Sequence, residues 1–213
     1  MTEQLPLALP HRPALGRADF IVTASNANAV AEIERWACWP NARLALIGPN
    51  GAGKTHLAHV FSTLTGAAHL SDLAALPVAA PVVIEDAASV AGNAAAEEAL
   101  FHHLNARQVA GAATLLTGVL PPARWSVALP DLASRLEATA IAEIAAPDDG
   151  LLSALLAKLF HDRGIRCSPP TLSYIAQRIE RSHAAARAVV ARIDRLSLAE
   201  GREVTRALAA RAL

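Results

Sequence analysis

The stretch Gly48-Pro-Asn-Gly-Ala-Gly-Lys-Thr55 decides the fold, because it matches the phosphate-loop pattern G-x-x-x-x-G-K-[ST] in full. Glycines let the backbone curl until successive N–H groups point at phosphate oxygens, and Lys54 adds a positive charge. Thr55 offers a hydroxyl to Mg²⁺, and the helix expected after it directs its positive end at the phosphates. The sequence therefore predicts that this loop binds ADP or ATP with Mg²⁺. The predicted loop residues are Gly48, Pro49, Asn50, Gly51, Ala52, Gly53, Lys54 and Thr55.

A second element of such sites is an apolar strand that ends in acid, which holds Mg²⁺ and orients the attacking water. Residues 82–84 (VVI), followed by Glu85 and Asp86, are the best candidate. The plainer alternative is a strand that ends in solvated carboxylates. P-loop ATPases normally place Asp first, and the extra methylene of Glu85 displaces the carboxylate by more than ~1 Å. We therefore expect nucleotide and Mg²⁺ binding to survive better than turnover.

The pattern on either side of the loop predicts an α/β fold. A parallel sheet flanked by helices is followed by a small all-helical domain. The expected strands are 43–47, 82–84, 113–117 and 136–144, and the expected helices are 26–39, 54–64, 94–108, 149–163, 169–180, 183–199 and a terminal one. We divide the chain into an extended proline-rich arm (1–19), a nucleotide-binding core (20–147) and a helical lid (148–213).

Composition excludes several classes of protein. The 213 residues are 53% hydrophobic, which argues against a disordered chain. Nineteen basic residues balance nineteen acidic ones, so no overall charge favours DNA or a membrane surface. Cys38 and Cys167 follow no metal or redox spacing, and no signal peptide or membrane-spanning run is evident. These features predict a cytoplasmic protein with no membrane partner.

Four stretches resemble one family, the AAA+ module of the bacterial replication initiator DnaA and its shortened homologue Hda. They are 20–26 (FIVTASN), 48–57 (GPNGAGKTHL), 97–106 (EEALFHHLNA) and 132–136 (LASRL). The third is the most specific, because P-loop proteins in general do not share it. The resemblance covers residues 20 to about 200 and implies an AAA+ core with a helical lid.

The resemblance also implies further nucleotide contacts from His56, Thr117 and Arg187. Thr117 stands at the family's sensor 1, but Gly118 and Val119 replace the polar pair that follows it there. Alanines occupy the expected sensor 2 positions, with Arg187 one turn later. Together with Glu85, these departures imply a module that retains nucleotide, most readily ADP, and has weak or no ATPase activity of its own.

Arg135 ends the fourth stretch, where the family carries its arginine finger. The resemblance implies that Arg135 acts in trans on ATP bound to DnaA, stabilising charge that develops on the transferred phosphoryl group. Asp131, one helical turn away, is the expected partner that holds the side chain. The alternative is an arginine that simply bonds to its own chain.

The arm contains Gln4-Leu-Pro-Leu-Ala-Leu9, which resembles the short peptide through which Hda docks on the DNA sliding clamp. Gln4 would bond to backbone, while Leu5, Leu7 and Leu9 would fill an apolar pocket. The chain has no room for the helix-turn-helix domain or the N-terminal domain of DnaA. We therefore expect no direct sequence-specific DNA binding.

Three functions fit these features. The first is an Hda-type regulator that bridges the clamp and DnaA. The second is a self-sufficient AAA+ ATPase, such as a helicase loader or transposition helper, and the third is a truncated relative that blocks initiation by joining DnaA filaments. A monomer and a homodimer both remain open. His102 and His103 lack a partner at metal spacing, so we expect no metal site at these two residues. Mg²⁺ is expected with the nucleotide, held by Thr55 and Glu85.

Overall fold

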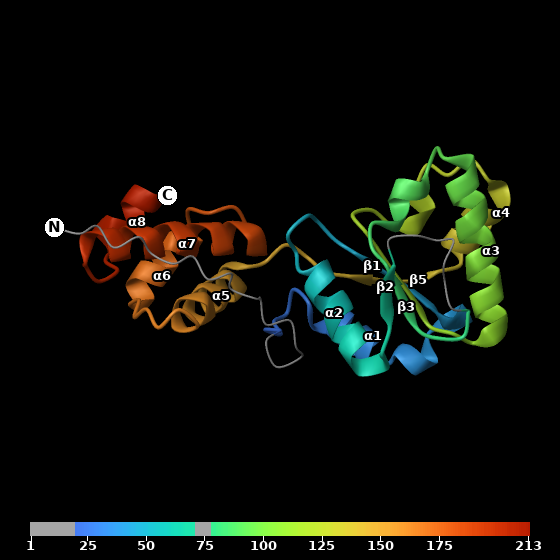
Figure 1. The fold of residues 1–213 in the computed structure, drawn as a ribbon, viewed down its shortest axis with the longest axis horizontal. Coiled ribbons are helices and arrows are strands. Elements are labelled where there is room, and N and C mark those ends of the chain that lie inside the picture. Colours follow the sequence, from blue (N-terminus) through green and yellow to red (C-terminus); the bar gives the residue numbers. More distant parts are fainter. Residues whose placement is uncertain (1–19, 71–77) are drawn as a thin grey trace, which may run out of the picture.

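Within the part of the chain that the structure describes, five parallel strands form one sheet in the order β2-β3-β4-β1-β5 (Figure 1). The structure is a computed structural model that describes residues 20–70 and 78–213. The strands are β1 (Arg43–Ile47), β2 (Ala68–Leu70), β3 (Val82–Ile84), β4 (Thr114–Gly118) and β5 (Ala140–Glu143). All residues of β1, β3 and β4 are buried, as expected for the centre of a parallel sheet covered on both faces.

Helices cover the two faces of the sheet. Helices α1 (Ala27–Glu34) and α2 (Lys54–Thr65) pack on one face, in a cluster that includes Leu44, Leu46 and Leu115. Helices α3 (Ala94–Ala110) and α4 (Pro130–Glu137) pack on the other, against Ile47 and Leu116. Alternate residues of one strand therefore serve opposite faces. Short 3₁₀ turns complete this part at Trp36–Cys38, Pro40–Ala42, Ala87–Val90 and Pro122–Arg124.

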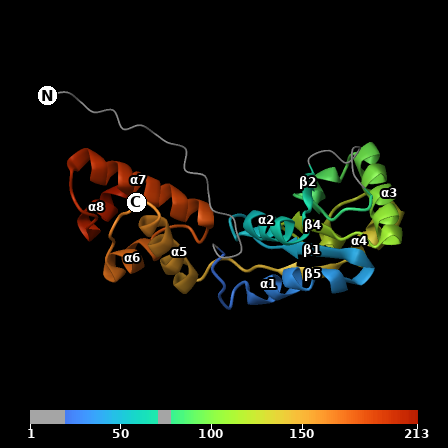
Figure 2. The same cartoon turned by 60° about the horizontal axis from the view of Figure 1, so that its bottom comes forward.

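Among the described residues, four further helices lie beside the sheet-containing part rather than over its faces (Figures 1 and 2). They are α5 (Asp149–His161), α6 (Pro169–Ala176), α7 (His183–Glu200) and α8 (Arg206–Ala212). Their inward side chains form a core of their own, which includes Leu156, Phe160, Ile175 and Val190. This arrangement is the α/β fold with a following helical bundle that the sequence predicts.

Several predicted elements differ from the observed ones, and the helix expected over 169–180, for example, ends at Ala176. The helix expected over 26–39 ends at Glu34, and the strand expected over 136–144 is confined to Ala140–Glu143. Residues 130–137 are instead helical as α4, because Leu132 and Leu136 lie one turn apart and are both buried in the core. Strand β2 is not among the predicted elements, because three residues are too few for a readable pattern.

Within the described residues, none of the helices has the length and apolar character needed to cross a membrane.

Candidate nucleotide site and arginine hollow

The phosphate loop joins β1 to α2, at the carboxyl edge of the sheet. Lys54 donates hydrogen bonds from Nζ to the carbonyl oxygens of Gly48, at 2.7 Å, and Pro49, at 3.0 Å. Gly53 precedes α2 with φ +109°, a left-handed conformation that side chains disfavour. Burial lowers the pKa of Lys54, and the nearby charge of Asp86 opposes that shift. The loop therefore holds the Lys54 ammonium group against carbonyl oxygens, and phosphate oxygens can replace these as its hydrogen-bond acceptors.

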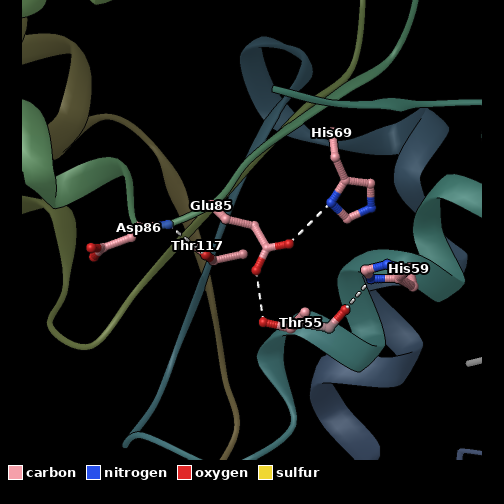
Figure 3. Close-up of polar contacts among 6 residues, drawn as sticks. All are labelled: Thr55, His59, His69, Glu85, Asp86 and Thr117. Atoms are coloured by element: carbon pink, nitrogen blue, oxygen red, sulfur yellow. Dashed lines mark hydrogen bonds and ion pairs between the residues drawn. The ribbon is translucent and has the colours of Figure 1, made fainter. Parts of the chain in front are cut away.

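Thr55 and Glu85 meet at the mouth of this loop (Figure 3). The Thr55 hydroxyl donates to Glu85 Oε2 at 2.7 Å. Mg²⁺ takes oxygen ligands and is commonly held by a carboxylate together with substrate phosphates. Two protein oxygens side by side at the phosphate loop fit such an ion, so Thr55 and Glu85 would hold Mg²⁺ when nucleotide is bound.

Asp86 and Thr117 connect the ends of β3 and β4. The backbone N–H of Asp86 donates to Thr117 Oγ1 at 3.0 Å. Asp86 has φ +48°, an uncommon conformation for a residue other than glycine, and its side chain points away from Thr55 (Figure 3). Glu85, and not Asp86, is therefore the carboxylate in contact with the phosphate-loop threonine.

These groups line a pocket of about 740 Å³ where β1, β3 and β4 end. Ligands of open α/β sheets bind at the carboxyl ends of the strands. The pocket is lined by Asn50, Gly51, Gly53, Lys54, Thr55, His56, Glu85, Asp86, Thr117, Gly118, Val119, His183, Ala184 and Arg187. Most of the predicted nucleotide residues are thus brought together, Thr117 and Arg187 included. The carbonyl oxygens of Gly48 and Pro49 accept the hydrogen bonds of Lys54, and Ala52 is a buried residue of the loop.

The amino end of α7 sits directly on the phosphate loop. The backbone N–H and Nδ1 of His183 both lie within hydrogen-bond distance of the Gly51 carbonyl oxygen, at 3.0 and 2.9 Å. A side chain at Gly51 would meet Ser182, since an added Cβ would lie 2.4 Å from that residue's Cβ. Burial lowers the pKa of His183, as does Arg187, while the bond to Gly51 raises it. His183 is not among the predicted site residues, because no local pattern links residues 51 and 183.

Arg135 lies in a separate hollow, of about 460 Å³, which it lines together with Arg43, Asp131 and Gln108. Arg43 begins β1, so this hollow is at the amino end of a strand whose carboxyl end carries the phosphate loop. Arg135 donates from Nη1 to Gln108 Oε1 at 3.0 Å. Arg135 thus forms its side-chain hydrogen bond with Gln108 rather than with the expected Asp131.

Arg43 gives the hollow a second positive charge. Its side chain is 2% exposed, and Nε and Nη1 have no hydrogen-bond partner among the described residues. Burial lowers the pKa of Arg43, and the charge of Arg135 lowers it further. Two guanidinium groups against the single carboxylate of Asp131 leave this hollow with a net positive charge, which favours an anion.

The predicted clamp-binding residues, Gln4, Leu5, Leu7 and Leu9, lie outside the described residues.

The phosphate loop, the acid after β3 and the helices that reach the pocket define a P-loop protein with an AAA+ fold. A solved structure of domain III of the Thermotoga maritima replication initiation protein DnaA matches it with a TM-score of 0.80 and 19% identity, covering 96% of this chain and 98% of that one. DnaA bound to AMPPCP and single-stranded DNA matches with a TM-score of 0.73 and 16% identity, covering 89% and 69%. The Thermotoga maritima RuvB Holliday junction branch migration motor matches with a TM-score of 0.73 and 18% identity, covering 93% of this chain and 71% of that one.

Sequence comparison identifies the relatives. The chromosomal replication initiator protein DnaA of Thermus thermophilus is 30% identical over 132 residues, which are 62% of this chain and 30% of that protein. DnaA of Thermomicrobium roseum is 29% identical over 136 residues, or 62% and 28%. The match thus spans under a third of the length of these relatives, and no protein-family profile matches the chain. The chain is homologous to DnaA over this region and has the AAA+ fold of DnaA domain III.

Proposed function

We propose that the protein is a regulator of replication initiation of the Hda type. It binds a nucleotide, most readily ADP, in its own pocket and uses Arg135 to stimulate hydrolysis of ATP bound to DnaA. The homology to DnaA supports a role in replication. The observation that carries the proposal is the separation of two sites, a nucleotide pocket at the carboxyl end of β1 and an arginine hollow at its amino end.

That separation supports action in trans. Arg135 does not line the pocket of its own chain, so its charge is available to a phosphate on another molecule. Arg43 supports the same use, because its buried charge adds to the attraction of an anion. An arginine supplied in trans typically accelerates phosphoryl transfer by about 10³ to 10⁵.

The pocket supports retention of nucleotide more than turnover. Glu85 is already engaged by Thr55 and also lies 3.0 Å from His69 Nδ1, so its carboxylate is held on two sides. A carboxylate held in this way is poorly placed to orient an attacking water. Lys54, Thr55 and Arg187 remain arranged around the space for phosphate.

Three further points belong to the same proposal. The partners are DnaA and the DNA sliding clamp. The residues that bind the clamp are Gln4, Leu5, Leu7 and Leu9. The core and lid divide near residue 147, and Mg²⁺ accompanies the nucleotide. The site of action is the cytoplasm, with no sequence-specific contact to DNA.

The test measures hydrolysis of radiolabelled ATP bound to DnaA, with the protein added in the presence and absence of DNA-loaded clamp. We expect stimulation that depends on the clamp and is lost in Arg135→Ala and in the double variant Gln4→Ala/Leu5→Ala. Arg124→Ala is the matched control, because Arg124 is an exposed arginine of the same core outside the hollow. Loss of stimulation in Arg124→Ala as well would contradict a specific finger.

A self-sufficient ATPase, such as a helicase loader, is the second candidate. The place of Glu85 at the phosphate loop favours it, because a carboxylate beside Thr55 can hold the Mg²⁺ that an ATPase needs. Appreciable ATP turnover by the isolated protein, without any effect on DnaA, would overturn the regulator and establish this alternative. Glu85→Gln should then abolish that turnover.

A further inference from the structure

Two histidines from different elements converge on Glu85, on the side of its carboxylate that faces away from Asp86 (Figure 3). The ring centroids of His59 and His69 are 4.3 Å apart, and His69 Nδ1 lies 3.0 Å from Glu85 Oε1. One possible ligand atom from each of the three residues lies within 4.8 Å of the others. The three therefore form a compact group of two imidazoles and one carboxylate.

The fold produces this group from residues that are distant in sequence. His59 follows Thr55 by four residues on α2, so both lie on one face of that helix. His69 pairs with Val83 across β2 and β3, and Glu85 follows Val83 by two residues. Because side chains of a strand alternate between faces, Val83 and Glu85 share a face, and it is the one that α2 covers.

The hydrogen bonding of His59 prepares its ring to bind a metal. Nδ1 of His59 lies 2.8 Å from the backbone carbonyl oxygen of Thr55. A carbonyl oxygen can only accept, so Nδ1 carries the proton, and Nε2 of the neutral ring has a free lone pair. Histidines that bind metals commonly donate their other N–H to a backbone carbonyl in this way.

His69 and Glu85 need little movement to bind the same ion. Two ligand atoms about 2.0–2.1 Å from a tetrahedral ion lie about 3.3 Å apart, close to the 3.0 Å between Nδ1 and Oε1. An ion would replace the proton between these two atoms, and that proton would pass through solvent to Nε2 of the same ring. The His69 side chain is 30% exposed, which gives water access for this transfer. Thr55 bonds to the other carboxylate oxygen, Oε2, and that bond can persist.

We propose that His59, His69 and Glu85 bind a divalent cation of the Zn²⁺ class, beside the nucleotide pocket. Two imidazole nitrogens and one carboxylate oxygen suit Zn²⁺ and Co²⁺, whereas Mg²⁺ prefers oxygen ligands. The site is distinct from the Mg²⁺ position implied at the phosphate loop, because neither histidine lines that pocket. The two sites share the carboxylate of Glu85, with Oε1 facing His69 and Oε2 facing Thr55. A cation bound at one site therefore weakens the attraction of this carboxylate for a cation at the other.

The experiment uses the full chain without nucleotide and with any histidine tag removed. Co²⁺ is the probe, because its visible absorption reports tetrahedral nitrogen and oxygen ligation, and Zn²⁺ is then titrated in competition. We expect one ion per chain, and affinity about tenfold or more weaker in His59→Gln and in His69→Gln. The matched control is His102→Gln, which removes an exposed histidine from α3 and should bind as the native protein does.

Two outcomes would overturn the site. One is native protein that gives no tetrahedral Co²⁺ spectrum, and the other is equal affinity in the native protein, His59→Gln and His69→Gln. Circular dichroism establishes that each variant is folded, and His69→Gln is the safer substitution because His69 is exposed. The readout uses no nucleotide and no DnaA, so it stands independently of the proposed regulatory function.

Discussion

His103 shows how burial alone changes the charge of a residue. Its side chain is 8% exposed and its Nε2 has no hydrogen-bond partner among the described residues. Burial, with a smaller effect from Arg107, lowers the pKa of His103 to about 4. The His103 ring is therefore neutral at pH 7 and packs as an uncharged group on the buried side of α3.

This pKa predicts loss of stability in mild acid. The unfolded chain takes up the proton near pH 6.5 and the folded chain only near pH 4, so stability is lost as pH falls between these values. We expect His103 to lower the free energy of unfolding by up to about 2 kcal/mol between pH 7 and pH 5, less where solvent screens the charge. Urea denaturation at both pH values measures it. His103→Gln should show a smaller loss, and His102→Gln, on the exposed side of the same helix, should behave as the native protein.

The side chain of Glu97 links the chain before α3 to the chain before α4. It lies in the first turn of α3, and its carboxylate accepts backbone N–H groups from Gly92, at 2.9 Å, and from Ala128 and Leu129, at 2.9 and 2.8 Å. Those bonds, the one from Gly92 foremost, lower the pKa of Glu97. One side chain thus fixes the start of α3 and the chain entering α4.

Glu97→Gln should lower the thermal unfolding midpoint by several degrees, because the amide group would turn N–H donors toward N–H donors. Glu98→Gln is the control, since Glu98 is exposed on the same helix and should leave the midpoint unchanged. Equal midpoints for the two variants would contradict this role. The contribution of the carboxylate is present above its unfolded pKa and is lost as pH falls, so the two variants should converge in acid.

The contact between the amino end of α7 and the phosphate loop should contribute both to stability and to ADP binding. Gly51 and Gly66 have nearly the same φ, +75° and +73°, but only Gly51 has a neighbour, Ser182, in the path of an added Cβ. Gly66→Ala should cost about 1 kcal/mol of stability through backbone strain alone. Gly51→Ala should cost more and also weaken binding of fluorescent ADP, because it displaces the amino end of α7. Equal costs and equal ADP affinities would show that the contact is immaterial.

Individual elements also show what could be predicted from the sequence. Strands β1 and β3 were predicted at their observed bounds, because a buried parallel strand is a short apolar run with a sharp polar or glycine end. Strand β2 and helix α4 are not predicted, since a strand of three residues carries no pattern and the spacing of Leu132 and Leu136 fits either period. His183, His59 and His69 were missed because tertiary contacts, not local spacing, bring them to the site.

At the scale of the whole molecule, nucleotide should stabilise both parts together. The pocket is lined from the sheet-containing part by Lys54 and from the helical part by Arg187, so a bound nucleotide contacts both. Mg²⁺–ADP at 100 times its Kd should raise the free energy of unfolding by about 2.7 kcal/mol. Thermal unfolding with and without ADP measures this. Lys54→Ala should abolish the shift, Arg187→Ala should reduce it, and Arg192→Ala, an exposed residue farther along α7, should preserve it.

Lys54 has one more consequence, which lies in its chemistry as an amine. The chain contains only two lysines, Lys54 at the phosphate loop and Lys158, which pairs with Asp162 at 3.6 Å. Burial lowers the pKa of Lys54 and so increases the share of the reactive, uncharged form. Acylating reagents therefore meet two side-chain amines, and bound phosphate would shield one of them. The extent of labelling at Lys54, compared with that at Lys158 by mass analysis of peptides, would then report the occupancy of the nucleotide site.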